Sequence, residues 1–525
     1  MYVMFVRTNV QKNKNGSVRI YLQIAENRRE GGKVRQKVIA TLGRLDNLLK
    51  SGQLERLAKS IAEKIEGLKV VNLSEGLFAE EALEYGPVYV LEWLWKKIGL
   101  HKILMEEFTK RVGEKRAEIE VQAIFEMVLN RLTEPESKLG TFTRWRDNYY
   151  FGDKGRADEI HLKDYYRAMD TLTASLEGIE EALYCQGRTL FGETELVFFD
   201  TTSTYFEGDK AENGKFGHSK DHRPDRKQVV ISLVVNEKKI PITHKVWEGN
   251  QVDSKAFEET IRAMKERFGV KRAILIADRG CVNQKITEEM ESQGIEYVVG
   301  MKMNLLDVRE TLARAGRYSH VEEDLWVKEV NVKDKRYVVC YNPIEAEHDR
   351  ETREEVLSKL EKTKNIKALV HNRAYRKFIK AKEVEIKEEK VKESEKYDGK
   401  WVLLTNTDME TEEVAKRYKE LWKVERAFRS VKGFMKVRPI HHWKERRIKA
   451  HIALVFLGLY SERVMENLLG EGWHWRRIKA SMKSLKMVKM KVEEEDYLIR
   501  TEMKEETQAL FKKLGIKTPK RITKM

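Results

Sequence analysis

At 525 residues the chain is long enough for roughly two to four domains. Its 101 Lys and Arg residues exceed its 85 Asp and Glu residues, and the net charge of +16 favours a polyanionic partner such as nucleic acid. The 3 cysteines are too widely separated for a disulfide scaffold or a metal-ligand motif, and no apolar run reaches the roughly 18 residues of a membrane span. We therefore expect a cytoplasmic protein with no membrane partner.

Residues 1–75 are predicted to form a small β-rich module followed by a helix. Apolar residues alternate along the run from Val18 to Ile24, and Gly31-Gly32 marks a turn before the next run. Residues 47–70 have the spacing of an amphipathic helix. The module is rich in Lys and Arg, so its edge is a candidate DNA contact. A charged edge that discourages strand pairing is an equal alternative.

Residues 76–190 are predicted to be a helical DNA-binding region. Aromatic residues such as Trp95 recur at helical spacing, which is more typical of a core than of base-stacking platforms. The segment from Thr141 to Asp147 mixes basic and aromatic residues, a combination found where proteins contact nucleic acid. Arg144 and Arg146 are therefore predicted DNA contacts.

A short apolar strand that ends in an acid is the centre of the predicted fold. The run from Leu196 to Phe199 is typical of a strand buried on both faces, and Asp200 follows it with the hydroxyl residues of 201–203 behind. Open α/β sheets place their chemistry at the carboxyl ends of such strands. The alternative is that Asp200 only begins a turn.

A second apolar run, from Ala273 to Ala277, ends in Asp278 and is followed by Arg279-Gly280. If the two strands are parallel neighbours, Asp200 and Asp278 meet at one edge of the sheet. Two adjacent carboxylates repel each other unless a cation or a shared proton lies between them. A hard divalent metal ion is the usual partner for such oxygen ligands.

The surrounding pattern predicts a mixed α/β sheet that is completed late in the chain. A hairpin over residues 229–246, a helix over 256–268 and a strand over 297–300 accompany the two acid-bearing strands. Residues 304–398 alternate in short, charge-rich segments, which indicates a β-rich insertion. The strand at 401–404 then returns to the core sheet.

A third acid lies on a predicted helix from Thr411 to Lys432. Glu425 belongs to a largely apolar face, where an unsatisfied acid costs free energy. An ion pair with Arg429 or Arg426 is one explanation for its position, and a metal site shared with the two aspartates is the other. The remaining residues of this face are Tyr418, Leu421, Trp422, Phe428 and Lys432.

These motifs resemble those of prokaryotic insertion-sequence transposases of the DDE type, in particular the cut-and-paste group with a Tyr-x2-Arg-x3-Glu-x6-Lys helix. The signature reads Tyr418-x2-Leu421-x3-Glu425-x6-Lys432 here, so Leu421 stands in place of the arginine. The resemblance covers most of residues 1–460. Further matches are the Phe-Asp-Thr-Thr block at Asp200, Asp-Arg-Gly at 278–280, the segment from Trp247 to Asn250, and the segment from Arg438 to His451.

The resemblance implies a fold and a domain order. The fold would be α/β, with an RNase H-like mixed five-stranded sheet interrupted by the β-rich insertion, a small N-terminal β module and helical flanking regions. The expected domains in chain order are 1–75 (β-rich module plus helix), 76–190 (helical DNA-binding region), 191–303 (core, first part), 304–398 (β-rich insertion), 399–460 (core, second part) and 461–525 (helical basic region).

The resemblance also implies an activity. Asp200, Asp278 and Glu425 would hold Mg²⁺ or Mn²⁺ and catalyse DNA strand cleavage followed by strand transfer into target DNA. The partner would be double-stranded DNA, both the terminal inverted repeats of the transposon and the target. A homodimer would act on paired ends, at the nucleoid in the cytoplasm.

DNA contacts and rival functions complete the expectations from sequence. Tyr418 and Lys432 match family positions that contact the transposon end, and Arg429 on the same helix face is a third predicted contact. One alternative function is a catalytically inactive DNA-binding derivative, and another is an RNase H-like nuclease that cleaves without joining.

Overall fold

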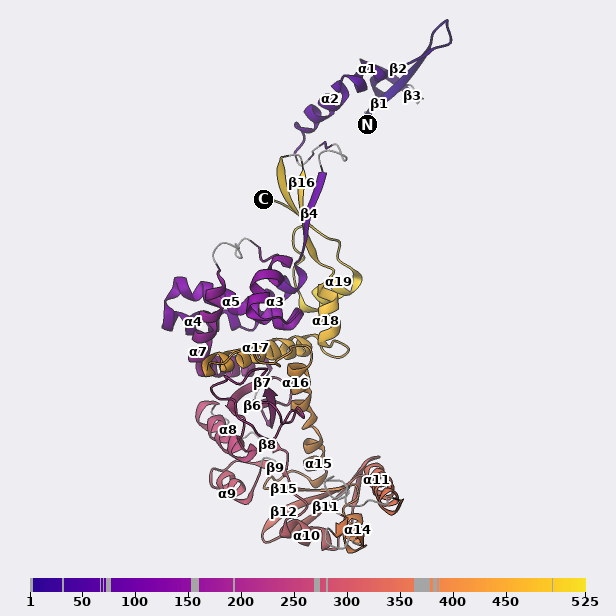
Figure 1. Cartoon of the computed structure of the whole chain (residues 1–525). Helices are drawn as coiled ribbons and strands as arrows, with labels where there is room; N and C mark the ends of the chain where they lie inside the picture. The colour runs from indigo at the N-terminus through magenta and orange to yellow at the C-terminus, as the bar shows by residue number, and fades with distance from the viewer. Residues whose placement is uncertain are drawn as a thin grey trace. The chain divides into compact units, whose positions relative to one another are not determined.

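The computed structural model is a mixed α/β protein that divides into two compact units, and each is described by itself (Figure 1). The first unit holds residues 1–82, 488–499 and 520–525, and the second holds residues 83–487 and 500–519. The residues that the structure describes are 3–30, 33–66, 68, 70–71, 77–152, 160–191, 194–268, 274–279, 282–362, 378–380, 385–386, 388–492 and 494–525.

The first unit contains the predicted N-terminal β module. Strands β1 (Val3–Lys12), β2 (Val18–Glu30) and β3 (Lys33–Arg44) pair antiparallel in that order, and helices α1 (Leu45–Lys50) and α2 (Gln53–Ala62) follow. The expected single helix over 47–70 is thus two short ones, separated at Gly52, whose φ of 66° is easy for glycine.

A second sheet joins a strand near the N-terminus to three strands near the C-terminus. Its order is β18-β17-β16-β4, with β4 at Leu77–Glu84, β16 at Lys486–Val492, β17 at Glu495–Arg500 and β18 at Ile522–Lys524. Residues 461–525 were predicted to be helical, and here the prediction is wrong in part. The three C-terminal strands lack a regular apolar–polar alternation, as in the β16 sequence KMVKMKV, so no period-two signal predicted them.

Helices on one side of the second unit surround a long central helix, α17 (Glu445–Leu469). Nearly every residue of α17 from Ile448 to Met465 is buried, because its middle part, Ile452 to Tyr460, is apolar all round and the helix packs against α5, α7 and strand β7. Within the described residues, no helix is both long and apolar enough to cross a membrane. The surrounding elements are α3 (Gly86–Lys97), α4 (Leu100–Val112), α5 (Glu114–Thr133), α6 (Lys138–Gly140), the π-helix η1 (Thr141–Trp145), the 3₁₀-helix η2 (Arg146–Asn148), α7 (Leu162–Phe191), α18 (Trp475–Met482) and α19 (Glu505–Leu514).

A nine-stranded sheet forms the rest of the second unit, in the order β10-β11-β12-β15-β9-β8-β5-β6-β7. The sequence predicted five strands. The difference arises because strands of the predicted insertion extend the same sheet through β15. The strands are β5 (Leu196–Tyr205), β6 (Gln228–Asn236), β7 (Pro241–Glu248), β8 (Ile274–Ala277), β9 (Tyr297–Gly300), β10 (Ser319–Glu322), β11 (Leu325–Val332), β12 (Lys335–Tyr341) and β15 (Lys400–Thr405).

Helices cover both faces of this sheet, so alternate residues of each strand enter two different cores. Phe199 of β5 packs on Phe257 of α8, with ring centroids 4.9 Å apart, whereas Phe198 belongs to the core on the other face. Asp200 is two residues after Phe198 and therefore points to the same face as Phe198. The remaining helices are α8 (Asp253–Phe268), α9 (Gln284–Ser292), α10 (Leu306–Ala313), α15 (Thr411–Lys419) and α16 (Trp422–Lys432).

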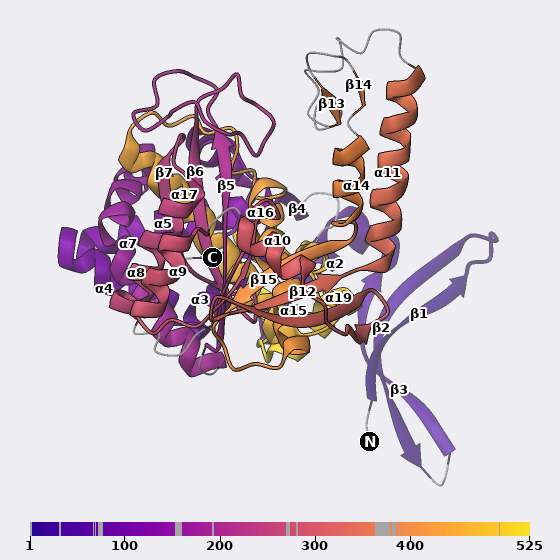
Figure 2. The same cartoon turned by 90° about the horizontal axis from the view of Figure 1, so that it is seen from below.

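The predicted insertion is less purely β than expected. Besides strands β10–β12 and the small pair β13 (Ile379–Lys380) and β14 (Glu385–Ile386), it contains the 20-residue helix α11 (Pro343–Lys362) and the helix α14 (Glu388–Glu395). Figure 2 shows α11 standing beside α14 at this end of the sheet. The sequence did not predict α11, because its residues are mostly charged and form almost no apolar stripe at helical spacing.

Candidate active site

The parallel pairing of β5 with β8 brings the first two predicted acids together. Phe199 lies opposite Ala277 in this register, and each is followed directly in the sequence by one of the two acids, Asp200 and Asp278. The sequence placed Asp200 at the end of its strand, but β5 continues to Tyr205 because β6 remains paired with it on the other side. Asp200 thus emerges where the shorter strand β8 has stopped.

The electrostatic surroundings of Asp200 disfavour its negative charge. Burial is the largest cause, and the nearby carboxylates of Asp278 and Asp253 add to it. Together they outweigh Lys220 and the backbone N–H of Thr201, which donates to Asp200 Oδ1 over 2.7 Å, and they raise the pKa of Asp200 to about 6. About a fifth of the Asp200 side chain (22%) remains exposed, so the carboxylate is open to a ligand.

Asp278 is held by a tyrosine of the predicted signature. The hydroxyl of Tyr418, on α15, donates to Asp278 Oδ1 over 3.0 Å. Burial, followed by the negative charge of Asp278, raises the pKa of Tyr418, so the phenol stays protonated and able to donate. Gly300 leaves room for this hydroxyl, since a Cβ there would lie 2.3 Å from it. The glycine of the Asp-Arg-Gly motif, Gly280, lies outside the described residues.

The predicted helix from 411 to 432 is two helices, α15 and α16, separated by a turn at Glu420-Leu421. The face that α16 buries differs from the predicted face. It consists of Val424, Ala427, Phe428 and Val431 together with Leu421, whereas Trp422 and Arg429 are exposed. This buried face packs on β5 and β6. Around the helix axis, it is rotated by about 100° from the face that was predicted to be buried.

Glu425 is an exposed residue in the first turn of α16, at the border of its buried face. Among the described residues it forms no ion pair within 4.0 Å, so the pairing with Arg429 or Arg426 that would have explained it structurally is not observed. An acid in the first turn is also favoured by the helix dipole. Glu425 is therefore left with an unpaired carboxylate on the helix that packs against the Asp200 strand.

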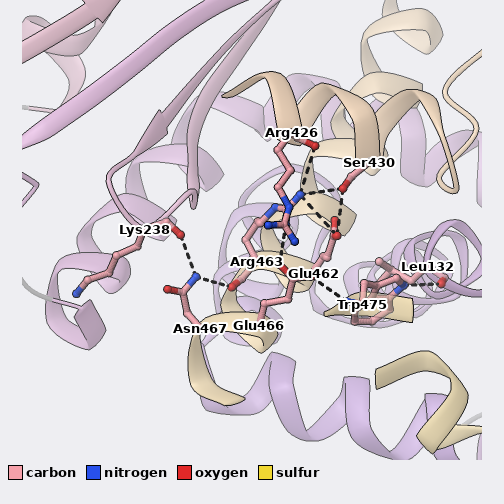
Figure 3. A network of polar contacts seen from close by, with 9 residues as sticks. All are labelled: Leu132, Lys238, Arg426, Ser430, Glu462, Arg463, Glu466, Asn467 and Trp475. Carbon is pink, nitrogen blue, oxygen red and sulfur yellow. Dashed lines mark hydrogen bonds and ion pairs between the residues drawn. The ribbon is translucent and has the colours of Figure 1, made fainter. Parts of the chain in front are cut away.

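A buried polar network fixes the position of α16 (Figure 3). Arg463 of α17, with 2% of its side chain exposed, donates to the backbone carbonyl of Arg426 over 3.5 Å and to Ser430 Oγ over 2.8 Å. Ser430 in turn donates to Glu462 over 3.1 Å, and Arg463 pairs with Glu466 over 2.6 Å. The backbone next to Glu425 is thus tied to the central helix.

The same network reaches two other parts of the unit. Glu466 accepts from the backbone N–H of Trp475 over 2.9 Å, and the Trp475 indole donates to the carbonyl of Leu132 in α5 over 3.1 Å. Asn467 donates to the carbonyl of Lys238, in the β6–β7 turn, over 2.9 Å. Sequence patterns do not find such a network, because its members are far apart in the chain.

Three polar residues near Asp200 were not among the predicted site residues. Thr201 Oγ1 donates to Asp253 Oδ1 over 2.5 Å, and the Lys220 ammonium lies 3.5 Å from Asp253 and 3.8 Å from Asp200. Thr201 belongs to the Phe-Asp-Thr-Thr block. Asp253 begins α8, where an acid has an ordinary helix-dipole explanation. Lys220 lies in a loop whose polar sequence had no distinguishing pattern.

Lys432 of the signature makes a buried ion pair. Its ammonium lies 2.6 Å from Asp221, a carboxylate that is only 2% exposed and that also pairs with Arg438. Burial lowers the pKa of Lys432. These contacts give Lys432 a structural role toward the loop that precedes β6, and they occupy the charge that was predicted to contact DNA. Its DNA contact stays a prediction, as do those of Tyr418 and the exposed Arg429.

The two predicted DNA-contacting arginines of the helical region differ in their surroundings. Arg146 is buried and pairs over 3.1 Å with Glu126, which has no exposed surface, so its environment favours a structural role. Arg144 is 72% exposed and pairs with Glu136 over 2.8 Å, a contact that water competes with. The aromatic residue between them, Trp145, belongs to the core at 2% exposure.

The carboxylates of Asp200 and Asp278, at this edge of the sheet, are of the ligand type that divalent metal ions prefer. Both residues supply carboxylate oxygens, and oxygen ligands of this kind suit a hard divalent cation. Within the described residues, however, no three acids, cysteines or histidines lie close enough to share an ion. The structure therefore brings together two of the three predicted ligands and leaves Glu425 outside that pair.

Comparisons with known proteins identify the family of this chain. Residues 192–460, just over half of the chain, match the model of the transposase DDE domain, and residues 6–69 match the N-terminal domain of the IS1634 family transposase. Comparison with curated protein sequences found no match. A solved structure of a piggyBac transposase synaptic complex with hairpin DNA is similar over 76% of this chain and 80% of its own, at 10% identity and a TM-score of 0.40. That score is too low to establish a shared fold.

The matched DDE domain contains Asp200, Asp278 and Glu425 and runs through both parts of the sheet. Proteins of this family act on DNA and use divalent metal ions. The N-terminal match adds the insertion-sequence type. The chain therefore belongs to the DDE transposases of insertion sequences, and it is an enzyme of that family.

Proposed function

We propose that this transposase binds the terminal inverted repeats of its element, cleaves DNA strands there, and joins the released ends to target DNA. The observation that carries the proposal is the parallel register of β5 and β8, which puts Asp200 and Asp278 side by side at one edge of the sheet. The strand order β7-β6-β5-β8-β9 within the larger sheet supports an RNase H-like core as the scaffold.

We propose that the metal ion is Mg²⁺ or Mn²⁺ and that Asp200, Asp278 and Glu425 would hold it. Bound there, the ion supplies Lewis-acid stabilisation and activates the attacking oxygen. The protein's own residues position the ligands. Tyr418 orients Asp278 by its hydrogen bond, and Arg463 and Ser430 fix the helix that carries Glu425. Glu425 is the proposed third ligand, on the helix that packs against the Asp200 strand β5.

DNA binding follows from charge as well as from family. The net charge of +16 favours the phosphate backbone, and exposed Arg429 on α16 is a contact candidate close to Glu425. Arg144 is the exposed candidate in the helical region. We further propose a homodimer on paired ends, acting at the nucleoid, so that each active site processes one end.

An end-cleavage and joining assay tests the proposed function. Purified protein is incubated with a labelled terminal repeat, a supercoiled target plasmid and Mg²⁺. The proposal predicts cleaved ends and joined product, both lost in Asp278→Asn with end binding retained. Cleavage without joining would favour the nuclease alternative, and end binding without cleavage would favour the inactive derivative. Sizing the protein on end DNA tests the dimer, since a fully active complex of one protein and one end would contradict it.

A further inference from the structure

Lys220 lies across the acidic edge of the sheet. Its ammonium donates to the Thr201 carbonyl over 2.8 Å and to Thr201 Oγ1 over 2.6 Å. The same ammonium lies 3.5 Å from a carboxylate oxygen of Asp253 and 3.8 Å from one of Asp200. A third of the side chain (33%) is exposed, so the amine is at the mouth of the site and is able to leave it.

The backbone beneath Lys220 is anchored. The N–H of Lys220 donates to Ser203 Oγ in β5 over 2.8 Å. The next residue, Asp221, is almost fully buried and pairs with Lys432 over 2.6 Å and with Arg438. These contacts fix where the side chain begins, while its four methylene groups let the charged end move without moving the loop.

The charge balance of this edge depends on Lys220. Asp200, Asp253 and Asp278 contribute three carboxylates, and the charges of Asp253 and Asp278 add to the cost of ionising Asp200. Among the described residues, Lys220 is the one cation that an ion pair joins to Asp200 or Asp253. A divalent ion that binds Asp200 would share that carboxylate with the ammonium, and like charges at such a distance repel.

We propose that Lys220 is a resident cation of the active site, which neutralises Asp200 and Asp253 and is displaced when a divalent metal ion binds. Lys220 thereby sets the affinity for metal and keeps the acidic edge stable without it. The inference rests on the proposed metal site at Asp200 and Asp278. The anchoring pair of Asp221 and Lys432 keeps the displaced amine beside the site.

Mn²⁺ binding to the full chain without DNA tests this inference, measured by calorimetry. Lys220→Met removes the competing charge at similar volume, so its dissociation constant for Mn²⁺ should be roughly tenfold lower than that of the wild type. The control is Lys227→Met in the same loop, whose amine donates to the Asp209 carbonyl and touches no acid of the site. Equal or weaker Mn²⁺ binding by Lys220→Met would overturn the inference.

Thermal unfolding supplies a second readout. Without metal, Lys220→Met should melt below the wild type because Asp200 and Asp253 are left without their cation, and saturating Mn²⁺ should close that gap. Lys220→Arg keeps the charge and should resemble the wild type. If Lys220→Met does not fold without metal, recovery of its circular dichroism on adding Mn²⁺ supports the inference, and no recovery overturns it.

Asp200→Asn separates the inference from the proposed function. Its loss of Mn²⁺ binding, together with an unchanged Lys220→Met, would leave the metal site standing and remove the role of Lys220. A wild type that binds no Mn²⁺ would remove both.

Discussion

The Tyr418 hydroxyl and the Asp278 carboxylate are joined by a hydrogen bond of 3.0 Å, from the last turn of α15 to the residue after β8. This contact links the helix pair that carries Glu425 to the sheet that carries the two aspartates. The signature tyrosine therefore has a positioning role inside the protein, because its buried hydroxyl donates to the Asp278 carboxylate and fixes the orientation of that carboxylate. Asp278 is thereby oriented before any metal or DNA arrives.

Removing this hydroxyl should impair cleavage without impairing DNA binding. A hydrogen bond to a charged group contributes about 1.5–3 kcal/mol, so Tyr418→Phe should lower the rate of end cleavage roughly tenfold or more. Cleavage and gel-shift assays on a labelled end measure the two effects. Tyr460→Phe is the matched control, because that buried hydroxyl donates to the neutral carbonyl of Leu183. Normal cleavage by Tyr418→Phe would show that Asp278 needs no such support.

A methyl group at Gly300 should act through the same contact. Its Cβ would lie 2.3 Å from the Tyr418 hydroxyl and 3.1 Å from the backbone nitrogen of Arg279, so the ring has to move and the hydrogen bond breaks. Gly300→Ala should therefore reduce cleavage about as much as Tyr418→Phe. The double variant should lose little more, because both changes remove one interaction. Independent, multiplying losses in the double variant would contradict this coupling.

Much of the sheet could be predicted because its strands are short, apolar and buried on both faces. The Asp200 and Asp278 runs, the hairpin of β6 and β7, and β9 follow from that pattern alone. The strand at Trp401 returns to the sheet as predicted, between β12 and β9. What the pattern missed is where strands stop. Pairing with β6 extends β5 past Asp200, and such a partner is invisible in the local sequence.

The helix with Glu425 shows a second limit. Periodicity treats 411–432 as one rod, but the turn at Glu420-Leu421 rotates α16 relative to α15 and changes which residues are buried. Leu421, the departure from the family signature, is itself buried at 8% exposure. Lys220, Asp221 and Asp253 could not be assigned, because their meaning comes from neighbours that the fold supplies.

Stability should fall as pH rises toward neutrality because of Glu462. Burial raises the pKa of Glu462 to about 7. The folded state thus holds a proton that the unfolded state, with an ordinary glutamate pKa of about 4.3, has released. Between these values the free energy of unfolding decreases with pH, by at most about 1.4 kcal/mol per unit from this group. Glu462→Gln removes this contribution.

Melting temperatures at pH 5 and pH 8 measure the Glu462 effect. The wild type should lose more stability between the two values than Glu462→Gln does. Glu471→Gln, at an exposed residue just after α17, is the control and should follow the wild type. Parallel pH profiles for wild type and Glu462→Gln would contradict the prediction.

Salt dependence should separate DNA-contacting arginines from structural ones. Each phosphate contact contributes roughly −0.9 to the slope of log binding constant against log salt concentration. Arg429 is exposed, so Arg429→Gln should make the slope shallower by the equivalent of about one phosphate contact and leave the stability unchanged. Arg146→Gln should leave the slope unchanged and cost about 3–5 kcal/mol of stability, because it leaves the buried Glu126 without its ion-pair partner. Binding that is indifferent to salt would refute the electrostatic account of DNA binding.

We propose that Glu425 completes the catalytic set with Asp200 and Asp278. Mg²⁺-dependent cleavage of a labelled transposon end by Glu425→Gln tests this, with Glu420→Gln as a control. Glu420 is nearby in the chain and its carboxylate pairs with Lys423 over 3.0 Å. We predict that Glu425→Gln loses roughly a thousandfold or more in cleavage rate while end binding and melting temperature stay normal, and that Glu420→Gln cleaves normally. Near-normal cleavage by Glu425→Gln would remove it from the catalytic set and contradict the claim.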